Sequence, residues 1–180
     1  MNENSYQELE NKDYFDRVTL AYGDLLKAKA YCEALLNLDA GVSFSTQRYI
    51  YEALCVALVV SYGRVFHSSK TVNEFTNENV SNRFGRLKRK IIESMNVNSV
   101  TLHHRIMEKR DKVFAHSDAS SRNYKHYSNS QLAVGRNPFY PYDHEEIQQV
   151  FELVETLVEA IGAEQSRVGS YTFDKNIFGM

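Results

Sequence analysis

The placement of proline constrains this 180-residue chain more than any other feature, because both prolines lie in one short segment, "NPFYPYD" at residues 137–143. Proline removes a backbone donor and ends helices, so the rest of the chain is free to be helical over long stretches. Apolar residues recur there at spacings of three and four, which is typical of amphipathic helices. We therefore predict an all-α protein, a four- to five-helix up-and-down bundle with an irregular loop before the last helix.

The expected helices are bounded by residues that accept hydrogen bonds from first-turn amides. The second helix is apolar on all sides in its middle and is expected at the centre of the bundle. The predicted spans are 13–38, 43–67, 79–95, 98–118 and 143–166. The predicted caps are Asp13, Ser43 or Ser45, Asn79 or Ser81, Asn98 or Ser99, and Asp143.

The chain is expected to form a single domain over residues 1–180, since 43% apolar and 12% aromatic residues are enough for one core. A polar N-terminal extension is predicted at about 1–12, and the tail at about 167–180 has no assigned structure. The loop at 119–142 is irregular, with a short extended piece expected at "SQLAVGR".

The longest apolar run, "ALCVALVV" at residues 53–60, is shorter than the roughly 20 residues of a membrane span. The first 16 residues are polar and acidic, unlike a secretory signal. We therefore predict a cytoplasmic protein with no membrane contact. Cys32 and Cys55 lie in apolar helical patterns and are expected to be buried thiols, with a disulfide or a reactive role as the alternative.

Charge is distributed unevenly along the chain. Residues 83–136 carry twelve Lys and Arg against four Asp and Glu, a net charge of +8, and the remaining 9 basic and 19 acidic residues sum to −10. A basic region of this kind suits a polyanion such as nucleic acid. The alternative is that these charges spread over several helix faces and pair with the acidic half.

Sequence motifs for several catalytic classes are missing. The six histidines and two cysteines show neither a zinc-helix spacing nor a Cys-x-x-Cys pair. The glycines in "YGR", "FGR" and "VGR" are single, so no phosphate-cradling loop is present, and there is no Gly-x-Ser-x-Gly elbow. We therefore expect no metal and no cofactor.

The segment "RDKVFAH", from Arg110 to His116, has residues suited to phosphodiester chemistry. Arginine fits phosphate oxygens, and histidine exchanges protons near neutral pH. RNA supplies its own nucleophile, the 2′-OH, so an arginine and a histidine form a minimal nuclease. On an ideal helix, however, these two residues lie roughly 120° and 9 Å apart. Either the helix loosens, the arginine side chain swings across, or two chains share one site; a solvated structural helix is the alternative to all three.

The "RDKVFAHSD" segment resembles the HEPN superfamily (higher eukaryotes and prokaryotes nucleotide-binding), small all-α bundles whose nuclease members carry Arg, four to six residues, then His. It is similar to the Arg-Asp-Lys and Ala-His-x-Asp version in families associated with abortive phage infection, and "SYGRVF" resembles the end of their central helix. The resemblance covers the order of helices and fewer than ten specific residues.

The resemblance implies a homodimer in which two Arg-x5-His motifs meet in one basic cleft and cut RNA without metal, leaving a 2′,3′-cyclic phosphate and a 5′-hydroxyl. It assigns proton transfer to His116, phosphate contact to Arg110 and an orienting role to Asp111. Basic residues that would contact the RNA backbone are Lys109, Lys112, Arg64, Arg86, Lys88, Arg89 and Lys90, each with a solvated or ion-paired role as the alternative.

The sequence thus predicts an endoribonuclease, a toxin or anti-phage component with a possible antitoxin partner. The RNA target and the roles of 119–142 and of the tail are not specified. A non-catalytic HEPN module that binds nucleic acid or a partner protein, and a plain helical scaffold, remain the alternatives.

Overall fold

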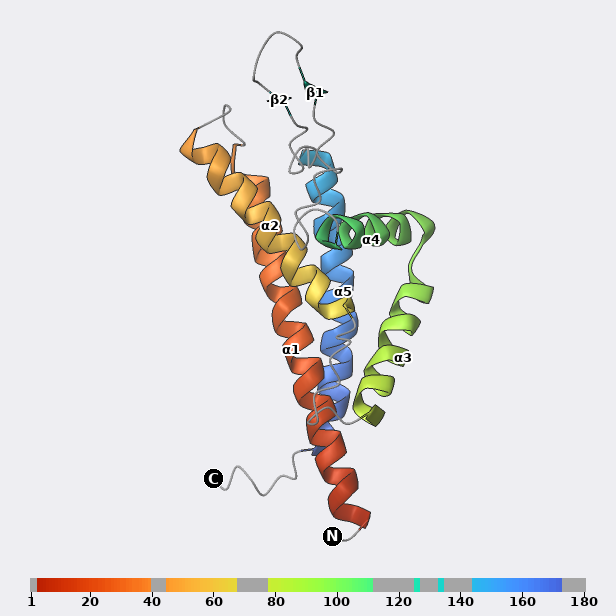
Figure 1. Ribbon diagram of the computed structural model, residues 1–180. Helices are drawn as coiled ribbons and strands as arrows, with labels where there is room; N and C mark the ends of the chain where they lie inside the picture. The colour runs from red at the N-terminus through yellow and green to blue at the C-terminus, as the bar shows by residue number, and fades with distance from the viewer. Residues whose placement is uncertain are drawn as a thin grey trace, which may run out of the picture.

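The computed structural model describes residues 3–39, 45–67, 78–111, 125–126, 133–134 and 144–172. These residues form five α-helices and one short pair of antiparallel strands (Figure 1), so the all-α prediction is confirmed. The elements are α1 (Glu3–Asn37), α2 (Thr46–Phe66), α3 (Glu78–Ser94), α4 (Val97–Lys109), β1 (Lys125–His126), β2 (Ala133–Val134) and α5 (His144–Thr172). Strand β2 lies within the segment that was expected to be extended.

Helices α1 and α5 lie side by side and run in opposite directions along the long axis of the molecule (Figure 1). Their buried residues alternate at spacings of three and four, the pattern by which two helices interlock along a seam. On α1 these are Tyr14, Val18, Ala21, Leu25, Ala28, Cys32 and Leu35, and on α5 they are Ile147, Val150, Leu153, Val154, Leu157, Ile161 and Val168. Phe151 and Val158 are partly buried at the edge of the α5 seam.

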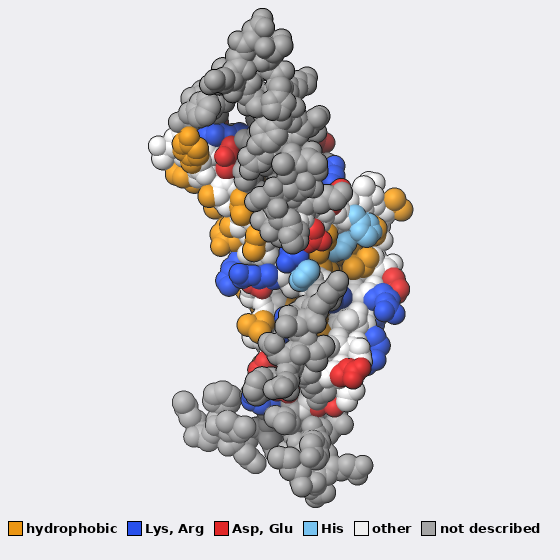
Figure 2. Space-filling model, viewed as in Figure 1, with side chains coloured by type: hydrophobic (Ala, Val, Ile, Leu, Met, Phe, Trp, Pro, Cys, Tyr) orange, Lys and Arg blue, Asp and Glu red, His pale blue; other side chains and the backbone are white. Residues whose placement is uncertain are grey.

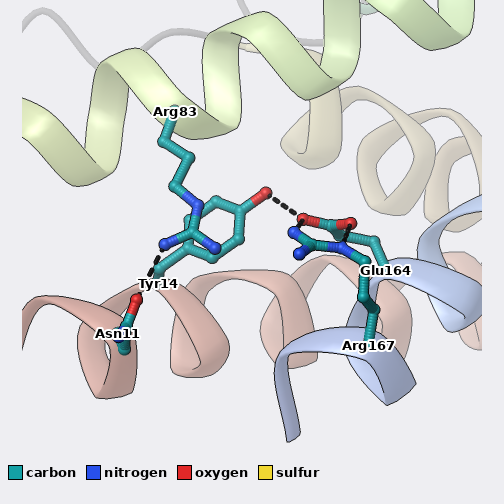
Figure 3. Close-up of polar contacts among 5 residues, drawn as sticks. All are labelled: Asn11, Tyr14, Arg83, Glu164 and Arg167. Atoms are coloured by element: carbon teal, nitrogen blue, oxygen red, sulfur yellow. Dashed lines mark hydrogen bonds and ion pairs between the residues drawn. The ribbon is translucent and has the colours of Figure 1, made fainter. Parts of the chain in front are cut away.

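The α5 seam has one polar position, Glu164, which lies between Ile161 and Val168. The Tyr14 hydroxyl of α1 donates to its Oε1 at 2.8 Å, and Arg167 donates to both carboxylate oxygens at 2.6 and 2.7 Å (Figure 3). These donors lower the pKa of Glu164, the hydrogen bonds from Arg167 being the largest cause. Burial, followed by the bond to Glu164, raises the pKa of the Tyr14 hydroxyl.

Arg83 ties α3 to this polar cluster. Its guanidinium carbon lies 3.8 Å from the centre of the Tyr14 ring, a cation–π contact, and its Nη1 donates to Asn11 Oδ1 at 2.9 Å (Figure 3). The Arg83 cluster, defined as Arg83, Asn11, Tyr14, Glu164 and Arg167, therefore joins three helices through hydrogen bonds and a cation–π contact.

Three helix boundaries differ clearly from the sequence prediction. The α-helical part of α4, predicted to run to 118, ends at Lys109, where a π-helical turn begins, and residues 112–118 lie outside the described residues. Helix α1 begins at Glu3, so the predicted polar extension at 1–12 is helical from residue 3 and Asp13 lies inside the helix instead of capping it. Contacts that α3 makes with Asn11, and with Glu10 through Asn79, give this early part of α1 a tertiary partner that the local pattern does not reveal. Helix α5 likewise continues to Thr172, into the tail predicted at 167–180.

The shorter helices begin close to where the sequence predicted. Ser45 caps α2 by accepting from the Arg48 amide at 3.1 Å, as expected. Asn96 caps α4 by accepting from the Ser99 amide at 2.9 Å, two residues before the first predicted cap. Helix α3 begins at Glu78, so Asn79 and Ser81 lie within it, while Asp143 lies outside the described residues.

Helix α2 is buried on one face, contrary to the expectation that it lies at the bundle centre with all sides covered. In the middle of the helix Cys55 and Val59 are fully enclosed, but Ala53 is exposed and Val56 and Val60 are only half-buried. The helix packs against α1 and α4, which cover one face of it in the described residues. Among those residues, α2 alone has the length and hydropathy of a membrane span, a test that the core helix of a bundle also meets.

Candidate functional site

The predicted catalytic arginine lies where α4 changes geometry. The Arg110 backbone N–H is shared between the Ile106 and Met107 carbonyls, and Arg110 and Asp111 enter a wider, π-helical turn. Such turns advance less per residue than an α-helix and often occur at functional sites. The geometry of an ideal α-helix therefore does not describe Arg110 and Asp111. His116 and Lys112 lie outside the described residues.

The Arg110 side chain lies across α2 at Gly63. A Cβ added at Gly63 would be 3.1 Å from Arg110 Nε and 3.0 Å from Cγ, and closer still to Cδ. Any larger residue would therefore push the arginine away from α2. Gly63 is buried, and the Arg110 side chain is only 20% exposed, so this contact restricts the arginine to one path across the helix.

Two partners hold the guanidinium at its end. Arg110 Nη1 lies 2.9 Å from His67 Nδ1 and donates to Asp111 Oδ1 at 2.6 Å. Since a guanidinium has only donors, His67 Nδ1 is the acceptor, which makes the ring neutral with its proton on Nε2. His67 is exposed and caps the end of α2, where its backbone N–H bonds to Gly63 at 2.8 Å.

The remaining donors of Arg110 are open. Nη1 uses both of its hydrogens on His67 and Asp111, so Nε and Nη2 retain three N–H groups that have no hydrogen-bond partner among the described residues. Asp111 is half-exposed. The Arg110 cluster, defined as Arg110, His67, Asp111 and Gly63, thus presents a cation and an imidazole next to solvent. Figure 2 shows histidine, cationic and acidic side chains gathered in the middle of one face.

A second histidine supports the site from within. The Tyr62 hydroxyl lies 2.8 Å from His103 Nδ1, and the Phe66 ring contacts the His103 ring edge-on at 4.6 Å. Burial, with a smaller contribution from His104, lowers the pKa of His103 to about 4. His103 is therefore neutral at physiological pH and braces α2 against α4.

A groove of about 360 Å³ opens beside this brace, between the end of α2, α3 and α4. Phe66 and Met107 line it, each within three residues of a member of the Arg110 cluster. Lys88 and Arg89 also border the groove. Lys88 Nζ donates to the Phe66 carbonyl at 3.2 Å, and burial, the largest cause, lowers the pKa of its ammonium.

The structure disperses the other basic residues that the sequence grouped as RNA contacts. The ammonium nitrogen of Lys109 is enclosed, close enough to influence the buried Cys55 thiol, and is not directed to solvent. Arg64 is 60% exposed and pairs with Asp24 of α1 at 3.6 Å, the structural alternative foreseen for it. On α3, Lys88 turns inward, whereas Arg86, Arg89 and Lys90 face solvent. At spacings of three and four, these three exposed residues share one face of α3, while Lys88 is not part of it.

Both cysteines are buried, as predicted, and burial raises the pKa of each thiol to about 12. A thiol with so high a pKa is a poor nucleophile at neutral pH. Neither cysteine therefore competes with the Arg110 cluster as a catalytic group.

Sequence reasoning missed Gly63 and His67. The signal available was a glycine inside a helix, which lowers helix stability by about 1 kcal/mol relative to alanine and so usually has a packing reason. His67 follows Gly63 by four residues, on the same helix face. Nothing in the sequence, however, says that Arg110 would be the group packed there.

Comparisons with protein-family models, with curated proteins and with solved structures gave no match. The assignment of a function therefore depends on the geometry of the Arg110 cluster and on the motif in which Arg110 stands.

Proposed function

We propose that this protein is a metal-independent endoribonuclease of HEPN type, acting as a homodimer in a toxin or anti-phage response. The observation that carries the proposal is the restrained Arg110 beside an imidazole, with three N–H donors that no residue of the described ranges engages. A guanidinium held in this way suits the developing charge on a phosphorus under attack, because its position is set before the substrate binds.

The reaction needs few groups. The 2′-oxygen of RNA attacks the adjacent phosphorus while its proton passes to His116, and the P–O5′ bond breaks as the 5′-oxygen takes up a proton. The products are a 2′,3′-cyclic phosphate and a 5′-hydroxyl. Arg110 binds a non-bridging phosphate oxygen, and Asp111 orients Arg110 through its 2.6 Å contact. The second motif of a dimer supplies the second proton-transfer group.

The test is cleavage of a fluorescent RNA in EDTA by the purified protein. The double variant Arg110→Ala, His116→Ala is expected to lose cleavage, and Lys12→Ala, an exposed change on α1, serves as the matched control. Mass spectrometry of the wild-type products is expected to show the cyclic phosphate. Equal cleavage by wild type and double variant, or cleavage by neither, contradicts the proposal.

One observation favours a second candidate, a non-catalytic module that binds nucleic acid or a partner protein. The Asp111 carboxylate already neutralises part of the Arg110 charge at 2.6 Å, which suits moderate binding better than strong transition-state stabilisation. Salt-dependent RNA binding with no cleavage products would support this candidate.

A further inference from the structure

We propose that the groove between the end of α2, α3 and α4 binds the base of one unpaired nucleotide of RNA. The proposal deepens the proposed function and rests on it for the choice of RNA as the ligand. This opening of about 360 Å³, the Gly85 groove, is lined by residues of the described ranges. Its volume is within the range of sites that bind small ligands.

The walls of the Gly85 groove suit a flat aromatic ring. Phe66 of α2, Ile92 of α3 and Met107 of α4 line it, and each of them is partly buried. The buried ring of His103 also lines the groove. Aromatic and thioether side chains bind bases through the face of the ring, with little dependence on which base it is. The groove therefore suits the body of a base more than its hydrogen-bonding edge.

Gly85 is a glycine in the interior of a helix that packing within the protein does not explain. Apart from its own helix, a Cβ added at Gly85 would meet no atom within 4 Å, whereas at Gly162 and Gly169 it would meet the rings of Tyr22 and Phe15. Glycine inside a helix lowers its stability relative to alanine, so such a residue usually has a packing or functional reason. At Gly85 the missing side chain keeps the groove open for a ligand.

A basic face of α3 borders the groove. Arg89 lines the groove and is exposed, and Arg86 and Lys90 lie on the same exposed face of the helix. Glu93 contributes one negative charge to the lining. The balance of these four residues is positive, so the edge of the groove suits the phosphates on either side of a base that enters it.

The groove is close enough to the Arg110 cluster for one strand to contact both. Met107 precedes Arg110 by three residues on α4, and Phe66 directly precedes His67 at the end of α2. Residues three apart on a helix are neighbours on its surface. A base can enter the groove only when it is unpaired, because a base in a duplex is stacked and cannot be splayed out. We therefore expect a preference for unpaired RNA, with little dependence on the identity of the base.

Binding of 2′-O-methyl oligoribonucleotides to the full chain tests the groove, since their blocked 2′-oxygens cannot attack the phosphate. Three fluorescein-labelled probes of equal length are compared by fluorescence anisotropy at low salt: a single strand, the same strand without its bases, and a duplex. Wild type is expected to bind the single strand about tenfold more tightly than the abasic strand, the scale of one stacking contact between a base and an aromatic side chain. This comparison needs no variant.

Gly85→Leu fills the groove. It is expected to lower affinity for the single strand about tenfold, to that of the abasic strand, and to leave affinity for the abasic strand and the duplex unchanged. The variant should fold, because leucine favours a helix more than glycine does and its Cβ would meet no atom within 4 Å.

Gly23→Leu on α1 is the matched control. Gly23 has the same open surroundings and does not line the groove, so this variant should bind all three probes as wild type does. Arg89→Ala removes a cation from the edge of the groove. It is expected to weaken binding of all three probes by similar factors and to reduce the salt dependence of that binding.

Equal affinity of wild type for the single strand and the abasic strand overturns the base site. Binding of the single strand by Gly85→Leu within twofold of wild type, or an equal loss in Gly23→Leu, overturns it as well. Base-dependent binding that Gly85→Leu abolishes, in a protein that cleaves no RNA, supports the base site while the proposed nuclease function fails. Cleavage that depends on Arg110 and is unaffected by Gly85→Leu supports the nuclease function and overturns the base site.

Discussion

Arg83 and Arg110 each cross from one helix to another, but their surroundings differ in one decisive respect. Arg83 lies against a buried tyrosine whose hydroxyl bonds to Glu164, so the Arg83 cluster contains its own carboxylate inside the helix seam (Figure 3). Arg110 is held by a glycine and a neutral imidazole, and its carboxylate partner, Asp111, is half-exposed.

The difference separates two uses of the same side chain. An arginine whose cluster encloses an anion contributes to stability, since its polar neighbours satisfy one another. An arginine that is fixed in place beside a half-exposed carboxylate and an exposed imidazole retains the capacity to bind an anion from solution. The predictions below are arranged by expected size, and each tests one side of this comparison.

The largest effects are expected when each of the two arginines is replaced by alanine in a separate variant. Arg110→Ala is expected to lower RNA cleavage by about 100-fold or more, as removal of a transition-state donor does, with little change in unfolding free energy. Arg83→Ala is expected to do the reverse, lowering unfolding free energy by about 1 to 2 kcal/mol while leaving cleavage intact. Urea unfolding and a cleavage assay on both variants measure this. Similar losses of stability in both variants would make Arg110 a structural residue.

Acid is expected to destabilise the two regions in different pH ranges. The folded-state pKa of His103 is about 4, below its ordinary 6.5, so the unfolded chain binds more protons between these values. Stability should therefore fall as pH drops from 6.5 to 4, by an amount on the order of 2 kcal/mol.

Glu164 should respond at lower pH. Its folded-state pKa is lowered, so the stability that it contributes is present above its unfolded pKa of roughly 4.3 and is lost as pH falls below that value. Urea unfolding of His103→Gln and Glu164→Gln at pH 7, 5, 4 and 3 separates the ranges. His103→Gln should weaken the pH dependence of the unfolding free energy between pH 6.5 and 4 only, and Glu164→Gln should weaken it below about pH 4.3 only. The reverse result, with each variant affecting the other pH range, would contradict the comparison.

A smaller effect is expected from Tyr14→Phe, which removes only the hydroxyl that donates to Glu164. The unfolding free energy should fall by about 1 to 2 kcal/mol, because a buried carboxylate loses one hydrogen bond. Tyr49→Phe, at an exposed position on α2, is the matched control and should change stability by less than about 0.5 kcal/mol. Equal effects of the two variants would show that the Glu164 contact contributes nothing.

The smallest effect is expected from Asp111→Asn. This change removes the negative charge beside Arg110 and keeps a side chain of similar size, so phosphate affinity should rise about twofold to fivefold, the scale of a partly exposed ion pair. Titration with inorganic phosphate measures it. A fall in affinity would show that positioning Arg110 is a larger effect of Asp111 than competing with phosphate for the guanidinium.

Much of the scaffold was predictable from local pattern. The confined prolines and the three-four spacing of apolar residues indicated a helical bundle, and the buried stripe of α5 and the Ser45 cap follow from the same rules. The start of α1 was not predictable, because Asp13 is a good cap by residue type. The hydrogen bond from Arg83 of α3 to Asn11 favours the helical conformation in the segment before Asp13.

For the candidate site, residue chemistry singled out Arg110, because a guanidinium fits phosphate oxygens, and the family resemblance added Asp111. The enclosure of the Lys109 ammonium and the inward turn of Lys88 could not be predicted from charge, since helical lysines usually face solvent.

The sequence by itself thus determined the helical class, the burial of the cysteines and the identity of the arginine on which the functional hypothesis depends. Periodicity and residue type are local properties, and these outcomes depend on little else. Only the tertiary structure decided that the carboxylate of the Arg83 cluster is largely enclosed, whereas the carboxylate beside Arg110 is half-exposed. That outcome depends on Gly63 and His67 of α2 meeting Arg110 more than forty residues later in the chain, a contact between surfaces that no local pattern encodes.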